Sequence, residues 1–270
     1  MAEDLTLSDI NSMLQELYHA SGAPYFFDDP FIGIAAADDP FFVKFKDIIG
    51  SHHWTPEEAL YFAAPEAKAQ SVIVWILPVN QRVRESNHTE KNGPSKVWAS
   101  MRSFGEQCNE NMRRQLCRLL QQKGYAAIAP HLEQLRQGFD IFGKGFTSNW
   151  SERHAAFVAG LGTFGLSAGL ITKRGIAMRI GSIVTDLKLP VTEREYGDDP
   201  FAWCTRCGAC AARCPGKAIG KTPEERDKKR CFEHIVNNVA PGRENTYGWM
   251  DLSLGCGLCQ TCVPCEFRKP

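Results

Sequence analysis

The chain has no excess of charge and no long apolar run. Its 270 residues include 31 Lys and Arg against 31 Asp and Glu, so no global field favours a nucleic acid or a membrane surface. No segment has the length of a membrane span, and the opening residues MAEDLTLSDI lack the apolar core of a signal peptide. We therefore expect a cytoplasmic protein with reduced thiols, no membrane partner and no particular affinity for nucleic acid.

Cysteine, in contrast, is plentiful and unevenly placed. Nine of the 11 cysteines lie within residues 204–270, in the run CTRCGACAARCP from Cys204, at Cys231, and in the run CGLCQTCVPC from Cys256. The first run has the C-x2-C-x2-C-x3-C-P spacing of bacterial ferredoxins, in which three thiolates bind one iron-sulfur cluster and the fourth binds another. A disulfide framework belongs to small secreted chains, and a four-ligand zinc site does not account for this spacing.

Nine cysteines are enough for two 4Fe-4S clusters, which need eight. By the ferredoxin rule, the first cluster takes three cysteines of the first run and one distant cysteine, while the second takes the cysteine before the proline and three others. Cys262 and Cys265 compete to complete the first cluster, and Pro264 favours Cys265 because a proline also stands beside a ligand in the ferredoxin spacing. The predicted metal ligands are Cys204, Cys207, Cys210 and Cys265 for the first cluster, and Cys214, Cys231, Cys256 and Cys259 for the second.

Hydrophobic periodicity predicts a layered α/β domain ahead of these cysteines. We expect helices over residues 8–21 with Ser8 as the cap, from Thr55 onward, over 96–123 and over 151–159, and strands over 71–77, 126–130 and 177–186. Strand, helix and strand in succession are typical of such a fold. The expected domains are residues 1–195 and 196–270. Cys108 and Cys117, in the long helix, are interpreted as small buried hydrophobes.

The turn Gly160-Leu-Gly-Thr-Phe-Gly165 matches the G-x-G-x-x-G dinucleotide fingerprint. That fingerprint follows a strand and opens a helix, with an acidic residue about twenty positions later. Asp186 lies near that distance, but the residues before the turn are helical in composition. The context therefore argues against a dinucleotide site.

This turn, together with the Glu152-Arg-His-Ala-Ala-Phe-Val-Ala sequence before it and the ferredoxin run after it, resembles epoxyqueuosine reductase. Arg230-Cys231 and the Cys256-Gly-Leu-Cys259 unit match the second-cluster positions of that family, and the resemblance covers roughly residues 70 to 265. It implies a layered cobalamin-reductase-type (nitroreductase-like) α/β domain, shared with reductive dehalogenases, followed by a two-cluster bacterial ferredoxin-like domain. In this arrangement the clusters deliver electrons to cobalt.

The resemblance also implies roles for the glycine turn. Gly160, Gly162 and Gly165 are the candidate cofactor-binding residues, because glycine permits a close approach of the backbone to the corrin or its tail. A tight connection from helix to strand explains the same glycines without a ligand. Both interpretations stay open at this point.

Two departures from the family change the expected reaction. The family has a proton-donating aspartate six residues before the motif glutamate, and this position is Phe146 here. Its role is therefore absent or has moved to a neighbour, and we name Glu152 and His154 as the candidate catalytic residues, with Asn149 as a further neighbour. Longer family members also have a C-terminal extension that helps to hold tRNA, whereas this chain ends five residues after Cys265. We expect a small-molecule substrate, not tRNA epoxyqueuosine.

Three functions fit these observations. The first is a reductase that takes electrons from an external donor such as flavodoxin or ferredoxin and passes them through two 4Fe-4S clusters to cobalamin or another centre. The second is a ferredoxin-like electron-transfer partner without its own catalysis, although that role does not require so large an α/β domain. The third is a reductase that reactivates a corrinoid held by another protein.

Overall fold

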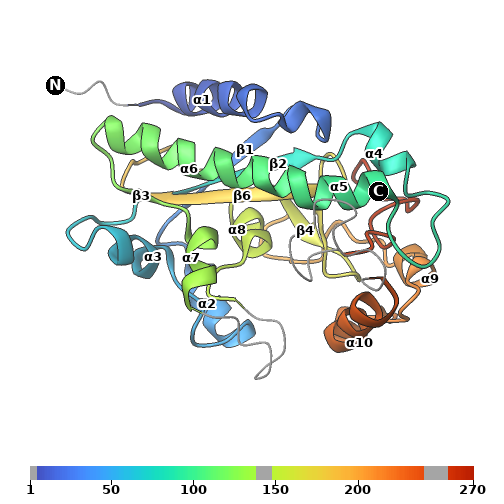
Figure 1. Cartoon of the computed structure of the whole chain (residues 1–270). Helices are drawn as coiled ribbons and strands as arrows, with labels where there is room; N and C mark the ends of the chain where they lie inside the picture. The colour runs from blue at the N-terminus through green and yellow to red at the C-terminus, as the bar shows by residue number, and fades with distance from the viewer. Residues whose placement is uncertain (1–4, 138–147, 240–254) are drawn as a thin grey trace.

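A four-stranded antiparallel sheet forms the centre of the computed structural model, which describes residues 5–137, 148–239 and 255–270 (Figure 1). Each neighbouring pair of strands is antiparallel. Trp75 lies opposite Gly181, where any side chain larger than hydrogen would collide with the indole ring, since a Cβ there would lie 2.2 Å from it. The strand order is β1 (Phe31–Ala36), β2 (Ser71–Pro78), β6 (Met178–Thr185) and β3 (Ala127–Ile128).

Helices cover both faces of this sheet, so the domain has three layers (Figure 1). Every residue of β2 is buried, and successive side chains enter different cores. Ile73 and Trp75 pack with α1 (Leu7–Ala20) and α6 (Glu106–Gln122). Val72 and Val74 pack with α2 (Pro40–Ile48), α3 (Pro56–Ala63) and α8 (Glu152–Val158). The predicted α/β layered domain is therefore present.

The helices and strands expected from the sequence are present, with differences in their bounds, whereas β1 and α2 were not expected. Thr55 caps α3 as expected and shares a capping box with Glu58. The first helix, however, begins at Leu7 and is capped by Thr6, because Thr6 and Asp9 form a capping box that starts before Ser8. The long helix predicted over 96–123 is divided into α5 (Lys96–Ser100), a π-helical turn (Met101–Gly105) and α6.

The sheet order was not evident from the succession of strand, helix and strand. β6 lies between β2 and β3 and is antiparallel to both, so β2 and β3 do not pair with each other. Below the sheet, β4 (Gly162–Phe164) and β5 (Leu170–Thr172) form a separate hairpin. No helix in the described ranges is long and apolar enough to cross a membrane.

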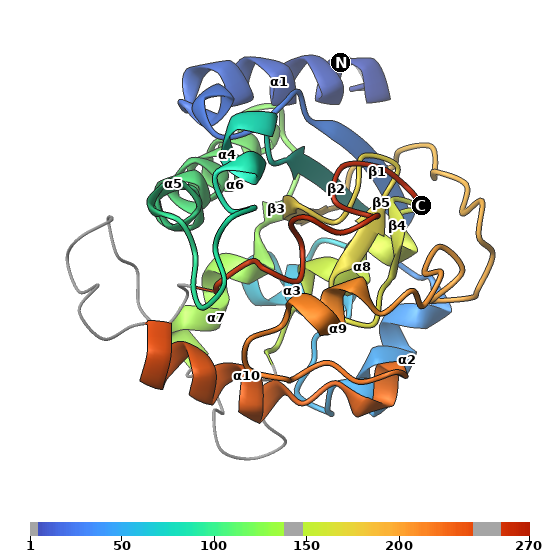
Figure 2. The same ribbon diagram turned by 90° about the vertical axis from the view of Figure 1, so that its right-hand side faces the viewer.

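We call the described residues from 196 onward (196–239 and 255–270) the cysteine-rich region, and those before it the sheet domain. The cysteine-rich region contacts the β4–β5 hairpin and the central sheet at several points (Figure 2). Trp203 N–H donates to Thr163 Oγ1 at 3.0 Å, and Ile176 N–H donates to the Cys265 carbonyl at 2.8 Å. The region contains α9 (Ala209–Arg213) and α10 (Lys228–His234), while α4 (Gln81–Glu85) and α7 (Pro130–Gln137) belong to the sheet domain. Because its last segment returns to the sheet domain, the boundary at residue 195 stays a prediction.

Candidate functional site

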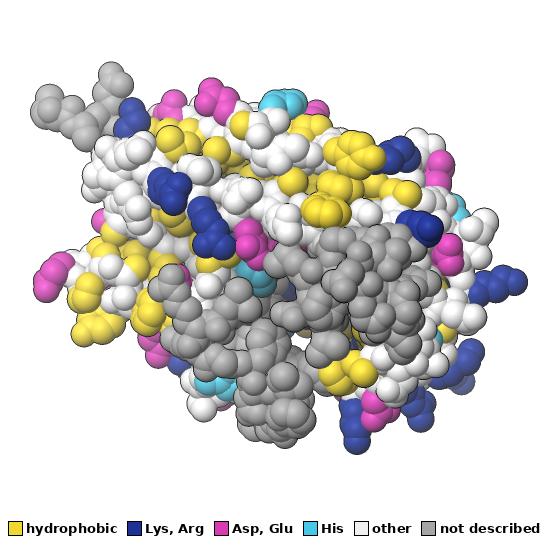
Figure 3. All heavy atoms as spheres, viewed as in Figure 1, with side chains coloured by type: hydrophobic (Ala, Val, Ile, Leu, Met, Phe, Trp, Pro, Cys, Tyr) yellow, Lys and Arg dark blue, Asp and Glu magenta, His cyan; other side chains and the backbone are white. Residues whose placement is uncertain are grey.

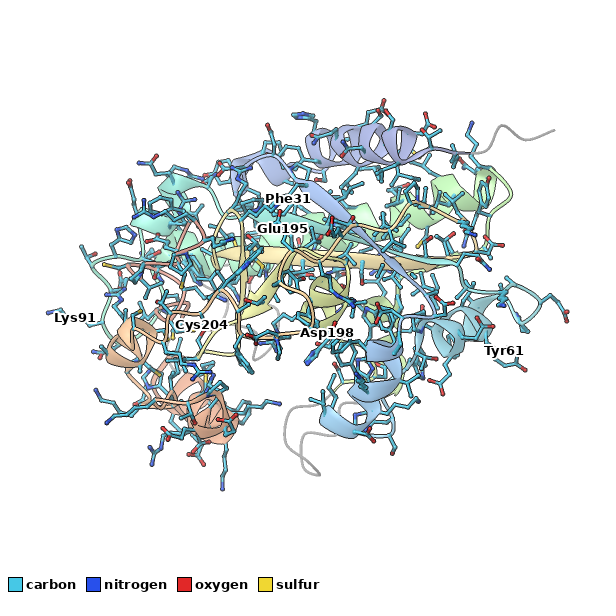
Figure 4. The ribbon with its side chains drawn as sticks, turned by 180° about the vertical axis from the view of Figure 1, so that it is seen from behind. Phe31, Tyr61, Lys91, Glu195, Asp198 and Cys204 are labelled. Carbon is cyan, nitrogen blue, oxygen red and sulfur yellow. The ribbon has the colours of Figure 1, made fainter. Side chains whose placement is uncertain are left out.

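Four of the predicted cluster ligands line one cavity between the hairpin and α9. They are Cys204, Cys207, Cys210 and Cys265, and the apolar part of the lining includes Leu166, Ile171, Ile176 and Val263. Figure 4 shows Cys204 on the loop that leads to α9. The three cysteines of the first run and one from the end of the chain therefore face a common space. This is the first thiol group.

The backbone of the first run accounts for this convergence. Arg206 and Gly208 adopt the left-handed conformation, with φ of 54° and 75°. Such turns are easy for glycine but rare for arginine, so the loop is held in a coiled path that a regular helix or strand cannot follow. Gly208 then caps α9, which carries Cys210.

Cys265 and Cys262 have different surroundings. Cys265 lines the cavity, and burial together with the nearby thiols of Cys210, Cys207 and Cys204 raises its pKa to about 12. Cys262 is exposed and has a φ of 55°, and its N–H donates to the Glu266 carboxylate at 2.9 Å. The geometry supports the choice of Cys265 over Cys262, which remains a prediction about metal binding.

The other four predicted ligands form a second thiol group. Cys214 belongs to a small buried cluster against which Cys231 and Cys259 pack. Burial raises the pKa of Cys256, and Cys231 and Cys214 lie near enough to raise it further. Within the described residues, no three Cys, His, Asp or Glu side chains are placed to hold a single metal ion. The ligands of a cube are spread more widely than those of one ion, because each thiolate binds a different iron.

Polar residues of the sheet domain hold the ligand-bearing segments in place. The buried Asn87 side chain donates to the Cys256 carbonyl and to Thr261 Oγ1, both at 3.1 Å. The buried Glu266 carboxylate pairs with His88 Nε2 at 2.8 Å. Arg213, beside Cys214, donates to the carbonyls of residues 87 and 88. Segments far apart in sequence are thus fastened to the loop after α4.

A cluster of buried charges lies between α6, α8 and β6. Arg113 is 1% exposed and donates to Glu106 at 2.8 Å and to Glu152 at 3.1 Å. Arg179 pairs with Glu106 at 3.2 Å, and Ser182 Oγ donates to Glu152 at 2.5 Å. Two carboxyl groups and two guanidinium groups therefore pair with one another inside the protein.

The two carboxyl groups of this cluster differ in pKa. Burial disfavours the ionised form of Glu106, but Arg179 and Arg113 outweigh it and hold its pKa at about 2. Burial dominates at Glu152 and raises its pKa to about 7, against the opposing effects of Arg113 and Ser182. Near pH 7, Glu106 is therefore ionised, whereas the Glu152 carboxyl group is partly protonated.

The structure separates the two predicted catalytic residues. Glu152 belongs to the charge cluster, whereas the His154 ring lies against Phe45 and Phe164 and its Nδ1 contacts Ser151 Oγ at 2.7 Å. Burial lowers the pKa of His154 to about 3, so the imidazole is neutral. Phe146, where the family has its aspartate, lies outside the described residues.

Sequence reasoning missed the partners of Glu152. Asn109 and Arg113 lie on the same face of α6 as Leu116 and Leu120, and all four are buried. Polar side chains at helical spacing within an apolar face are the signal that could have identified them. The contribution of Ser182, on β6, has no such signal, because it depends on how the sheet pairs.

Contacts with the protein itself explain two of the three glycines in the turn. A Cβ at Gly160 would lie 2.7 Å from the Glu193 carbonyl oxygen, and one at Gly162 would lie 2.2 Å from the Ile171 carbonyl oxygen. Gly160 also has a φ of 75°. Gly165 lines the cavity of the first thiol group. A cofactor-binding role for these glycines stays a prediction, and the turn runs from helix to strand, opposite to a dinucleotide fingerprint.

Comparison with known proteins supports a relation to epoxyqueuosine reductase. No family model matches the chain. The epoxyqueuosine reductase of Gloeobacter violaceus is 36% identical over 124 residues, a match that covers 43% of this chain and 36% of that protein. The chain is therefore related to epoxyqueuosine reductase, although the match spans about a third of the length of this curated relative.

Solved structures show the same fold. The epoxyqueuosine reductase of Streptococcus thermophilus matches with a TM-score of 0.54 and 15% identity over 96% of this chain and 66% of that chain. The catabolic reductive dehalogenase NpRdhA matches with a TM-score of 0.54 and 15% identity over 97% of this chain and 37% of that one. These similarities extend the likeness in fold to almost the whole chain.

Proposed function

We propose that this relative of epoxyqueuosine reductase is an iron-sulfur oxidoreductase. In this proposal, electrons pass through two 4Fe-4S clusters to a cobalamin or another centre, where a small molecule is reduced. The observation that carries it is the gathering of eight cysteines into two groups of four, each drawn from segments far apart in the sequence. The related proteins are reductases, which supports an enzymatic role.

The raised pKa values of these thiols favour iron-bound thiolates over separate free thiolates. Burial raises the pKa of Cys210, Cys256 and Cys265, and neighbouring thiols raise each further. Free thiols in such surroundings are neutral, whereas bound iron supplies the positive charge that lets them ionise. The same crowding that disfavours separate thiolates thus suits ligands that share one cube.

The two groups would have different tasks. Cys207 of the first group is exposed, which suits electron entry from an external carrier such as flavodoxin or ferredoxin. Arg102 lies between the second group and the charge cluster. Arg179 of the charge cluster donates to the Arg102 carbonyl at 3.0 Å. Burial lowers the pKa of Arg102 to about 9, while Glu106, Cys256 and Cys259 are near enough to raise it. We therefore assign the second cluster to the step nearest the substrate.

Glu152 is our candidate for the proton donor. Its pKa of about 7 places the carboxyl group near the pH at which general acids are most effective. Arg113 and Ser182 each donate a hydrogen bond to one of its two oxygens, so the carboxyl group is held in one orientation. It would take the role that the family gives to the aspartate replaced by Phe146. His154, neutral and enclosed by aromatic rings, is assigned no proton transfer.

Cobalamin enters this proposal through the relation to epoxyqueuosine reductase. When bound, it would supply the metal that receives electrons from the second cluster and reduces the substrate. We propose a small-molecule substrate, because Phe146 replaces the family's proton donor. This chain's own residues would supply the electron path and, at Glu152, the proton.

Anaerobic reconstitution with iron, sulfide and cobalamin tests the proposal. We expect a protein with both clusters that binds cobalamin and reduces it when given electrons, with a corrinoid absorbance that changes accordingly. Full clusters with no affinity for cobalamin or flavin would contradict it and favour a ferredoxin-like partner. Tight binding of a separate corrinoid protein, with no substrate reduced, would favour a reactivating reductase. Cys262→Ser is the matched control, since it removes a thiol outside both groups.

A further inference from the structure

Two guanidinium groups lie side by side on the turn between β4 and β5. Arg226 Nε donates to the carbonyl of Ser167 at 3.2 Å, and Arg153 Nη1 donates to the carbonyl of Ala168. Because Ser167 and Ala168 are adjacent in the chain, these two hydrogen bonds hold the guanidinium groups of Arg226 and Arg153 close to each other. Lys228 is close to both, as burial lowers its pKa and Arg153 and Arg226 lower it further.

Among the described residues, this group of positive charges has no carboxylate partner. Within the part of the chain that the structure describes, Arg153, Arg226 and Lys228 form no ion pair, and the arginines donate to backbone carbonyls instead. Three like charges at close range repel one another unless a negative group lies among or beside them. Figure 3 shows Lys and Arg side chains gathered around α9 and α10. A negatively charged group nearby would therefore stabilise this arrangement of three positive charges.

The second thiol group is that neighbour. Arg226 Nη1 donates to the Ala218 carbonyl at 2.9 Å, and the Ala218 N–H in turn donates to Cys214 Sγ at 3.4 Å. Cys259 packs against the same small buried cluster as Cys214 and Ala218. Thiolates bound to iron carry negative charge, so a cluster here would lie directly beside the three cations.

We propose that Arg153, Arg226 and Lys228 supply the counter-charge of the second cluster and hold its reduction potential above that of the first. A nearby positive charge favours the reduced form, which is the more negative one, and so raises the potential. The first thiol group lies in a mainly apolar cavity, and no Lys or Arg is among the described residues that line it.

This inference rests on the proposed function and gives the electron path a direction. One electron from a reduced carrier protein would enter at the first cluster. It would then pass to the second, which is reduced as the first is reoxidised. The arginines take no part in proton transfer and touch no substrate, so they are positioning and tuning residues.

Redox titrations followed by electron paramagnetic resonance test the inference at fixed ionic strength. They are made in a Cys265→Ser background, in which only the second cluster is expected to remain. Arg226→Gln should lower the midpoint potential by an amount equivalent to about a tenfold change in electron affinity, about 59 mV for one electron. Arg226→Lys should restore most of the potential, because it keeps the charge.

Lys229→Gln is the matched control, since the Lys229 side chain is 82% exposed on α10, the helix that also carries Lys228. It should leave the potential nearly unchanged. If Arg226→Gln loses its iron, Arg153→Gln and Lys228→Gln carry the test, because both side chains are exposed and should each lower the potential.

Unchanged potentials in all the glutamine variants would overturn the inference, as would an equal fall of both clusters in a chain that retains Cys265. A wild-type chain that binds no iron would instead overturn the proposed function. That failure appears in the iron analysis before any potential is measured, so the two results are distinguishable.

Discussion

The arginines of the buried charge cluster and those beside the second thiol group have different kinds of partner. In the sheet domain, the buried Arg113 has two carboxylate partners, and Arg194 pairs with Asp39 at 2.7 Å. Beside the second thiol group, Arg226 donates to backbone carbonyls and forms no ion pair with any described residue. Buried charges that are paired within the protein need no bound ion to balance them. Around Arg226, a bound iron-sulfur cluster would supply the negative charge that no described side chain supplies through an ion pair, and this difference supports a cluster at the second thiol group.

The largest expected effect is on iron content. Cys265→Ser should remove the first cluster, about four irons, because its thiol lines the cavity with three other ligands. Cys262→Ser should leave iron nearly unchanged, since Cys262 is not among the residues that line the cavity. Iron and sulfide analysis after anaerobic reconstitution distinguishes them. Loss of four irons in Cys262→Ser alone would reverse the assignment.

Next in size is the effect of breaking the charge balance in the sheet domain. Arg113→Met leaves Glu106 and Glu152 without their shared partner, so the free energy of unfolding should fall by about 3–5 kcal/mol. Arg114→Met is the control, as its side chain is 48% exposed and should change stability by no more than about 0.5 kcal/mol. Equal effects in urea denaturation would refute the claim that the buried pairing matters.

A third prediction concerns Glu152. If it donates a proton, Glu152→Gln should lower turnover by about a hundredfold or more, and wild-type turnover should fall as pH rises through about 7. The raised pKa also means that the neutral carboxyl stabilises the fold, a contribution that is complete below the usual pKa and is lost as pH rises through about 7. Measuring turnover and stability against pH separates these effects. A variant that keeps wild-type turnover would exclude Glu152 as the donor.

The smallest effect should come from a helix cap far from the thiols. Thr55→Ala removes the acceptor for the Glu58 N–H and should cost about 1 kcal/mol. Iron content should stay the same, because α3 packs in the sheet domain. Thermal unfolding and iron analysis together check this. A loss of iron would show that the two regions are more tightly coupled than their charge patterns indicate.

Local signals explain what the sequence could predict. Thr55-Pro56 marked a helix start, the apolar run from Ser71 marked β2, and the cysteine spacing indicated the two groups of four. Each of these depends on residues close together in the chain. The choice of Cys265 over Cys262 was harder, because it depends on how the last segment folds back on Ile176.

Long-range pairing explains what the sequence could not predict. The position of β6 between β2 and β3 follows from antiparallel pairing across about a hundred residues, which leaves no local pattern. The same pairing brings Ser182 to Glu152, and the loop before α10 brings Arg226 beside Arg153. The surroundings of the proposed proton donor and of the proposed counter-charge therefore become visible only in the folded structure.

The central claim is that the eight cysteines hold two 4Fe-4S cubes. Mössbauer spectroscopy of the anaerobically reconstituted wild-type chain, combined with iron and sulfide analysis, measures this directly. We predict about eight irons and eight sulfides per chain, all in cubes, as expected for two clusters with four thiolates each. About four irons, or zinc in place of iron, would contradict the account.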